Sequence, residues 1–121
     1  MQQKSIPIEP SLRILQINVE RLSLAKCAVL AKLVEEYDVK VILLQETHLK
    51  SKVDLNGRCR IQNFTVADSI FHRHYGITTL VKSSLNSVRI IQKDDNDDVE
   101  VLVISIGKTG IANIYKPPSK K

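Results

Sequence analysis

The sequence lacks the features that mark membrane-spanning, secreted and disulfide-stabilised proteins. No apolar stretch in its 121 residues approaches the length needed to cross a bilayer. Residues 1–10 contain two prolines and no apolar core of a signal peptide, so they resemble neither a secretory signal nor a transit peptide. The two cysteines, Cys27 and Cys59, are far apart and have no metal-binding spacing. We therefore expect an intracellular protein, nuclear or cytoplasmic and not secreted, with reduced thiols and no membrane contact.

Length and charge set the next limits. A chain of 121 residues can form one domain with a real core, but it is short for an α/β enzyme whose sheet is covered on both faces. We expect a loose lead-in over residues 1–11, a partial domain over 12–116 and a basic tail over 117–121. The net charge is +5 although five acids crowd into residues 94–100, so the rest of the chain is more basic. The candidate contacts to nucleic acid are Lys50, Lys52, Arg58 and Arg60.

The first part of the chain predicts a strand, a helix and a second strand. Residues 12–18 place apolar side chains on both faces of a strand. From Ser23, a good N-cap, apolar residues recur at helical spacing to about Tyr37. The next strand, residues 39–45, follows at once, which favours a parallel pair with a right-handed crossover. Asn18 and Glu46 would then lie at the same edge of the sheet.

The second part of the chain predicts strands without helices. Residues 47–60 are polar and basic without periodicity, which is typical of a loop. Turn residues then separate strands near residues 60–66, 75–82, 87–92, 99–106 and 111–115, an antiparallel meander. The acidic run of residues 94–98 lacks the glycine and the closing glutamate of a calcium loop, so a solvated hairpin turn is favoured. An exposed loop is likewise favoured over a zinc site for His72 and His74.

Polar residues stand at the ends of three predicted strands. The apolar run of residues 41–44 ends in Gln45 and Glu46, at the sheet edge where open α/β sheets keep their ligand sites. A glutamate at a strand end is more often a solvated loop residue or a helix cap than a metal ligand. The residues at the other strand ends therefore decide between these interpretations of Glu46. Mg²⁺ is typically bound by one or two protein carboxylates, and water and phosphate complete its ligands. Glu46 and Glu20 could supply these carboxylates. Asn18 and Asn113 could hold phosphate or orient a carboxylate, and Tyr115 could donate a hydrogen bond to a phosphorus centre.

The order of these short motifs resembles the endonuclease/exonuclease/phosphatase superfamily. Within it, the sequence is most similar to the apurinic-endonuclease-like domain of non-LTR retrotransposons, the jockey-like elements especially. The resemblance covers residues 12–119 and is carried by Asn18, Glu20, Gln45, Glu46, Thr47, His48, Tyr75, Gly76, Asn113, Ile114, Tyr115, Lys116, Pro117 and Pro118. It implies the N-terminal half of a four-layer α/β sandwich, made of the strand-helix-strand unit and the antiparallel meander.

The resemblance also implies a chemistry: cleavage of phosphodiesters in DNA with Mg²⁺, or Mn²⁺, by a domain associated with a reverse transcriptase. Glu46 matches the metal-binding glutamate, and Glu20 stands where relatives often have aspartate or asparagine. Asn18 matches an asparagine near the metal and the phosphate, Tyr115 a tyrosine that contacts the scissile phosphate, and Asn113 precedes it in the usual pattern. Ile17 stands where many relatives have tryptophan.

Two motifs of this superfamily are missing from the sequence. They are a Gly-Asp-Phe-Asn segment and a Ser-Asp-His segment, which supply the water-orienting carboxylate and a phosphate-contacting histidine. We therefore expect little or no turnover from this chain alone. We also expect an uncovered apolar sheet face, which the missing half of the domain or a second copy would cover. Two alternatives stay open: a non-catalytic remnant that binds nucleic acid, and a phosphatase or exonuclease of the same superfamily.

Overall fold

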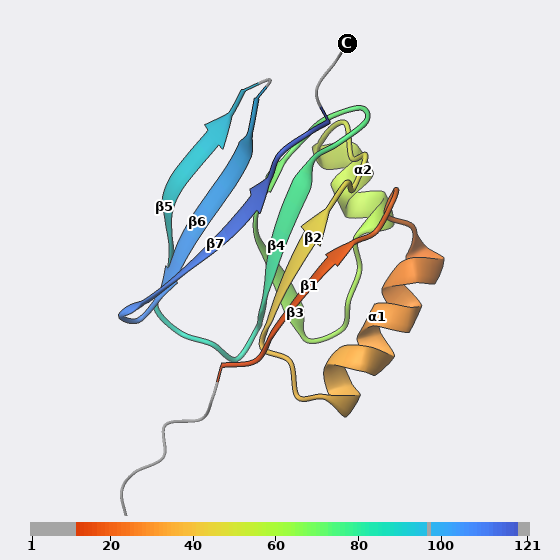
Figure 1. Ribbon diagram of the computed structural model, residues 1–121. Coiled ribbons are helices and arrows are strands. Elements are labelled where there is room, and N and C mark those ends of the chain that lie inside the picture. Colours follow the sequence, from red (N-terminus) through yellow and green to blue (C-terminus); the bar gives the residue numbers. More distant parts are fainter. Residues whose placement is uncertain (1–11, 97, 119–121) are drawn as a thin grey trace, which may run out of the picture.

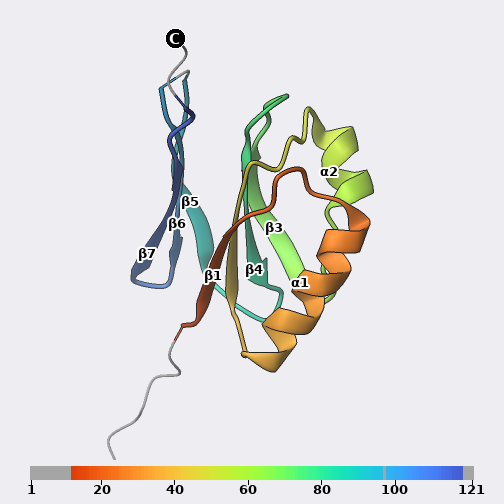
Figure 2. The same ribbon diagram turned by 45° about the vertical axis from the view of Figure 1, so that its right-hand side comes forward.

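The computed structural model describes residues 12–96 and 98–118 and has three layers (Figure 1). Two helices cover one face of a four-stranded sheet, and a three-stranded sheet covers its other face (Figure 2). The strand order is β1-β2-β4-β3 in the first sheet and β5-β6-β7 in the second. The elements are β1 (Ile14–Asn18), α1 (Leu24–Glu36), β2 (Val41–Gln45), α2 (Lys52–Arg58), β3 (Phe64–Ile70), β4 (Ile77–Lys82), β5 (Val88–Asp95), β6 (Glu100–Ile106) and β7 (Thr109–Tyr115).

Strand β2 runs through the centre of the molecule. It pairs in parallel with β1 and antiparallel with β4, and every one of its residues is buried. Because side chains alternate along a strand, Ile42 and Leu44 pack against α1, whereas Val41 and Leu43 face the second sheet. The prediction of a strand buried on both faces is confirmed. The parallel strand-helix-strand unit is confirmed as well.

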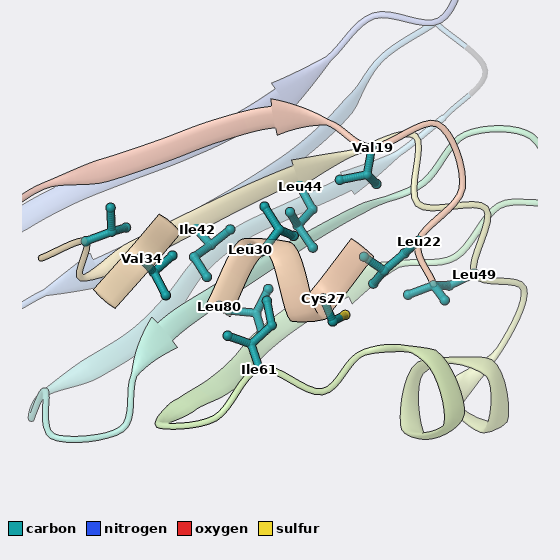
Figure 3. Close-up of a cluster of buried hydrophobic side chains, with 11 residues drawn as sticks. Val19, Leu22, Cys27, Leu30, Val34, Ile42, Leu44, Leu49, Ile61 and Leu80 are labelled. Carbon is teal, nitrogen blue, oxygen red and sulfur yellow. The ribbon is translucent and has the colours of Figure 1, made fainter. Parts of the chain in front are cut away.

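Helix α1 forms where the sequence predicts it. The Ser23 side chain accepts a hydrogen bond from the Lys26 amide and so satisfies one of the free N–H groups of the first turn. Cys27, Leu30 and Val34 form the buried stripe that contacts the sheet (Figure 3). Burying each large aliphatic side chain contributes about 1.5–3 kcal/mol. The helix is therefore anchored mainly by this stripe.

The meander divides between two sheets, which corrects one expectation. The face of the first sheet opposite α1, expected to be uncovered, packs on β5–β7, where Ile104 and Ile111 contact Val41 and Leu43. The uncovered apolar surface lies instead on the outer face of the second sheet. This outer face is formed by Val101, Val103, Ala112 and the half-exposed Ile114, and no described element lies over it.

Three local expectations are also corrected. Residues 47–60 contain α2, which begins where the Ser51 side chain accepts a hydrogen bond from the Asp54 amide. The third strand begins at Phe64, four residues later than expected, because a turn precedes it, in which the Phe64 amide donates to the Ile61 carbonyl at 3.1 Å. Strand β1 is an edge strand with one exposed face, since Ile14, Gln16 and Asn18 have no sheet above them.

The acidic run does lie at a hairpin. Strands β5 and β6 pair antiparallel from Val88 with Ile106 to Asp95 with Glu100, and the described residues Asn96, Asp98 and Val99 lie between the two strands. Glu100 itself is buried at the start of β6. The predicted lead-in and most of the predicted tail lie outside the described residues. Within the described ranges, neither helix is long and apolar enough to cross a membrane.

Candidate functional site

The site is built where the first two strands end side by side. Beyond the strands, the backbone pairing continues: the Val19 amide donates to Gln45 at 2.9 Å and the Arg21 amide donates to Glu46 at 2.8 Å. The amide of Leu22 donates to Thr47 at 2.9 Å. These bonds hold the loop after β1 against the loop after β2. The prediction that Asn18 and Glu46 share one edge of the sheet is confirmed.

Three elements converge on the Glu46 carboxylate. The Asn18 side-chain amide donates to Oε2 at 2.7 Å, and the Tyr115 hydroxyl at the end of β7 donates to the same oxygen at 2.5 Å. The Oδ1 atom of Asn18 accepts the amide of Glu20 at 3.0 Å, which turns the Asn18 amide nitrogen toward Glu46. Residues far apart in the chain therefore fix one carboxylate from two sides.

This geometry sets the charge of the site. The hydrogen bond from Tyr115 first, and the one from Asn18 second, hold the pKa of Glu46 below its usual range against the opposing effect of burial. Burial and the neighbouring Glu46 raise the pKa of Tyr115, so this phenol keeps its proton. Glu46 is consequently an ionised acceptor at neutral pH, suited to binding a cation rather than donating a proton.

Backbone strain collects around this carboxylate. Glu20, Arg21, Glu46 and His48 all have positive φ values, from 44° to 75°. Non-glycine residues adopt this region rarely, and such residues cluster at ligand sites. The hydrogen bonds between the two loops hold these conformations in place. The residues with strained backbone therefore lie in the two loops that follow β1 and β2, and Glu46 is one of them.

Aromatic and imidazole rings border the site. The Tyr75 ring lies 5.9 Å from that of Tyr115 and 4.8 Å from that of His72. The Nδ1 atom of His72 accepts the amides of His74 and Tyr75 at 3.0 and 3.1 Å, so His72 closes a turn. Across residues 12–96 and 98–118, no three metal-binding side chains gather. The hydrogen bonds of His72 place both histidines in a turn, in agreement with the predicted loop.

The donor set at Glu46 fits a hard cation held largely by water and phosphate. All hydrogen bonds that described residues donate to Glu46 end on Oε2, so Oε1 faces none of them. Mg²⁺ needs only one or two protein carboxylates of this kind. Glu20, the second candidate ligand, is exposed, and it joins the network through its backbone amide. Of the two predicted ligands, Glu46 is therefore the one whose carboxylate the described structure fixes in place, so it could hold such a cation.

Asn113 does not face the site, which corrects its predicted role. Its side chain is 1% exposed, and its amide nitrogen donates to Leu44 O, Thr78 O and Thr79 Oγ1 at 3.3 Å each. The side-chain amide of Gln45, in the first sheet, donates to the Ile114 carbonyl of the second sheet at 2.8 Å. These amides join the two sheets. Asn113 thus places β7, and with it Tyr115, without contacting Glu46 itself.

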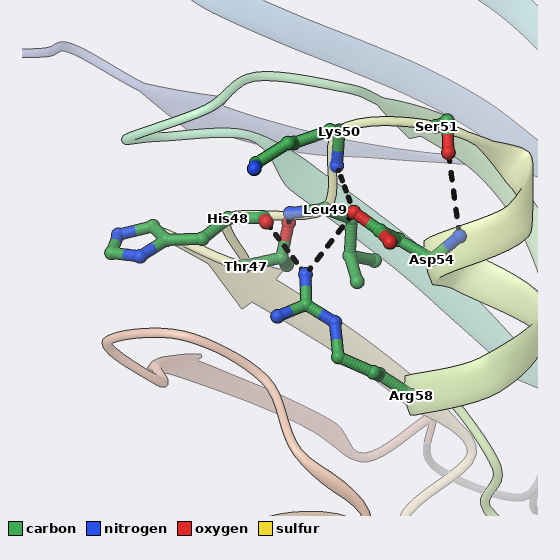
Figure 4. A network of polar contacts seen from close by, with 7 residues as sticks. All are labelled: Thr47, His48, Leu49, Lys50, Ser51, Asp54 and Arg58. Carbon is green, nitrogen blue, oxygen red and sulfur yellow. Dashed lines mark hydrogen bonds and ion pairs between the residues drawn. The ribbon is translucent and has the colours of Figure 1, made fainter.

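The predicted basic contacts divide into two kinds. Arg58 is half-buried: its guanidinium donates to the His48 carbonyl at 2.6 Å and lies 3.7 Å from Asp54, so it anchors α2 to the site loop (Figure 4). The predicted contact of Arg58 with nucleic acid stays a prediction. Lys50, Lys52 and Arg60 are exposed. The His48 and Lys50 side chains extend away from α2 in Figure 4.

Glu100 is a site-associated residue that sequence reasoning missed. It was counted only as one of the five acids of residues 94–100, yet it is 1% exposed and contacts the loop beside Thr47. The alternation of β6 contained the signal, because Glu100, Leu102 and Ile104 share one face of the strand. Leu102 and Ile104 follow Glu100 at every second position of the strand and are apolar, which indicates that Glu100 also points inward.

Comparisons with known proteins show what the fold of this chain resembles. No protein-family model matches the sequence, and no curated protein matches it. The crystal structure of AP endonuclease LMAP from Leishmania major is similar over 86% of this chain, with a TM-score of 0.60 and 23% identity. The chain spans 40% of that protein's length. It therefore has an α/β fold like part of an AP endonuclease.

Proposed function

We propose that this chain is the N-terminal part of a Mg²⁺-dependent phosphodiesterase, a DNA endonuclease of the non-LTR retrotransposon type. The observation that carries the proposal is the ionised Glu46 carboxylate, held by Asn18 and Tyr115 where β1 and β2 end. The similar structure is itself that of an AP endonuclease, which supports the same substrate class. The ordered motifs of the sequence support the retrotransposon assignment.

Each of the three residues has a distinct part in this proposal. Glu46 would hold Mg²⁺, or Mn²⁺, together with water and a substrate phosphate. The ion supplies a positive charge that stabilises the charge developing on the phosphate oxygens. Asn18 orients the carboxylate by donating to Oε2. Tyr115 keeps its proton and can donate it as a hydrogen bond to a phosphate oxygen placed beside Glu46.

The proposal includes an incomplete catalytic set. The sequence lacks the two motifs that supply the water-orienting carboxylate and the phosphate-contacting histidine in this superfamily. We expect this chain alone to bind metal but to turn DNA over slowly or not at all. Activity would require a longer product of the same reading frame, in line with the chain spanning 40% of the similar protein.

Two measurements test the proposal. On the chain alone, Mn²⁺ should broaden the NMR signals of Asn18 and Thr47, and Glu46→Gln should abolish this broadening. On the longer product, Mg²⁺-dependent nicking of plasmid DNA should fall at least about 100-fold in the same variant, because a metal ligand contributes several kcal/mol to the transition state. Glu36→Gln, on the exposed end of α1, is the matched control. Unchanged broadening or nicking in Glu46→Gln would refute the assigned role.

A second candidate function is nucleic-acid binding without cleavage. It is favoured by Lys50, Lys52 and Arg60, which are exposed on and beside α2, close to the site loop. Reversing these three charges should weaken DNA binding and reduce its salt dependence, since each phosphate contact releases counterions. Binding that is salt-sensitive in a longer product without any Mg²⁺-dependent nicking would favour this second candidate. Release of inorganic phosphate or of single nucleotides would instead indicate a phosphatase or an exonuclease.

A further inference from the structure

A buried carboxyl group lies behind the loop that carries Glu46. Glu100 opens strand β6 and is 1% exposed. Both of its carboxylate oxygens accept the amide of Gly76, each at 3.1 Å. Gly76 immediately precedes β4 in the first sheet, whereas Glu100 belongs to the second sheet. One side chain of the second sheet therefore holds a backbone amide beside the site.

Gly76 passes this contact on to the site loop. Its carbonyl accepts the amide of Thr47 at 3.0 Å, and the carbonyl of Tyr75 accepts the amide of His48 at 2.8 Å. Thr47 and His48 directly follow Glu46 in the chain. The order of contacts is thus Glu100 to Gly76, Gly76 to Thr47, and Thr47 to Glu46 through one peptide bond.

The connection has little freedom to adjust. Gly76 has a φ of +96°, and a Cβ atom built on it would lie 2.9 Å from the Ile70 carbonyl oxygen and 3.0 Å from Thr47 Oγ1. Real Cβ atoms essentially never come within 3.0 Å of another atom, so the contact with Ile70 opposes a side chain, and a side chain rarely adopts this φ. The backbone of this turn is therefore packed directly against Thr47. A displacement of the Gly76 backbone would therefore displace Thr47 as well.

We propose that Glu100 is a positioning residue of the Glu46 site, which holds the Gly76–Thr47 connection firmly when ionised and loosens it when protonated. Calling Glu46 the centre of a site rests on the proposed function, but the link between Glu100 and Thr47 does not. The ionised carboxylate accepts a charge-assisted hydrogen bond from the Gly76 amide. Protonation removes that charge and so weakens the hydrogen bond that the Gly76 amide donates to both oxygens.

The surroundings of Glu100 bring this proton near neutral pH. Burial raises the pKa of Glu100 to about 7, opposed by the Gly76 amide and assisted by Asp95, its cross-strand partner on β5. On its other side, Tyr115 of β7 is the cross-strand partner. Tyr75 precedes Gly76, and its ring lies beside that of His72. No cation among the described residues pairs with Glu100.

The same burial has a cost in stability. A carboxyl group whose pKa is higher in the folded protein than in the unfolded chain binds its proton more tightly when the chain is folded. Its contribution to the free energy of unfolding is therefore present at low pH. That contribution is lost as pH rises from about 4.5, the ordinary value, to about 7. The ionised form therefore weakens the fold while it strengthens the bond to Gly76. This combination is typical of a group that serves a site rather than the core.

The test is an NMR titration of the metal-free chain between pH 5 and pH 9. The side-chain carboxyl carbon of Glu100 and the amides of Gly76 and Thr47 should all shift with one midpoint near pH 7. Glu100→Gln should remove that step from both amides. Asp95→Asn is the matched control and should lower the midpoint while keeping the step. His72→Gln should also keep it, which excludes the neighbouring imidazole as its source.

Separate outcomes would overturn the proposal and the function on which it rests. An ordinary midpoint of about 4.5 for Glu100, or an amide step that persists in Glu100→Gln or vanishes in His72→Gln, would refute the positioning role. If Glu100→Gln does not fold, the wild-type midpoints alone decide: agreement supports the link and disagreement refutes it. Because no metal or DNA is present, failure of Glu46 to bind Mn²⁺ would refute the function and leave this result standing.

Discussion

At the scale of single residues, the hydrogen bond between Tyr115 and Glu46 controls the charge of the site. It is the largest cause that lowers the pKa of Glu46, ahead of Asn18. A carboxylate whose pKa is lower in the folded protein than in the unfolded chain stabilises the fold at pH values above its unfolded-state pKa. This stabilisation is lost as the pH falls through its folded-state pKa. The polar network around Glu46 is therefore both a candidate metal ligand set and a source of acid sensitivity.

Tyr115→Phe should raise the pKa of Glu46 toward its ordinary value, because the hydroxyl donor is lost while the ring is kept. It should lower the free energy of unfolding at pH 7 by about 1 kcal/mol and flatten its loss below pH 4.5. Carboxyl-carbon NMR titration of Glu46 and urea unfolding at several pH values measure both effects. Tyr37→Phe, at a 56% exposed tyrosine, should change neither. An unchanged Glu46 titration in Tyr115→Phe would contradict the role given to this bond.

At the scale of elements, the sequence predicts the strongly patterned segments and misses the weakly patterned one. Helix α1 has an apolar pattern of helical period that predicts its buried face, and strand β2 is marked by the continuous apolar run of residues 41–44. Helix α2 is only Lys52–Arg58 long and none of its residues is fully buried, so no stripe marks it. The pair Ser51 and Asp54 was its local signal, as a cap with an acidic residue three positions later. Arg58 then fixes the helix through contacts that only the folded chain supplies.

Helix α2 contains a glycine that weakens it. A Cβ atom on Gly57 would meet no heavy atom within 4 Å, and alanine is the better helix former. Gly57→Ala should raise the free energy of unfolding by about 0.5–1 kcal/mol. Gly107→Ala, which is equally open but has a φ of +59°, should lower it by about 1 kcal/mol. Urea unfolding midpoints compare the two, and a midpoint for Gly57→Ala at or below that of the wild type would contradict this account of α2.

At the scale of the whole molecule, the second sheet buries one face and leaves the other uncovered. The outer face formed by Val101, Val103, Ala112 and Ile114 has no described element over it, and β7 has one unpaired edge. An apolar sheet face with a free edge favours association. We expect a second copy of this chain, or the further residues of the longer product proposed above, to cover it. The stability and the assembly of this chain are therefore linked through this face.

Ile114→Lys should reduce self-association of the chain, because it places a charge on the outer face at a side chain that is 52% exposed. Sedimentation velocity over a range of concentrations should show a shift toward monomer. Val53→Lys is the matched control, since Val53 is 79% exposed on α2 and away from this sheet. A chain that is monomeric throughout, or whose association is the same in both variants, would contradict the prediction.

By itself the sequence determines the strand-helix-strand unit, the hairpins of the second half and the Asn18–Glu46 edge, because residue periodicity and turn chemistry act over short distances. Only the tertiary structure decides that Tyr115 reaches Glu46, that Asn113 joins the sheets instead of facing the site, and that Glu100 lies buried behind Gly76. These contacts join residues 24–69 positions apart, on two different sheets. Local pattern cannot fix how two sheets are packed, since that depends on which side chains interdigitate across them.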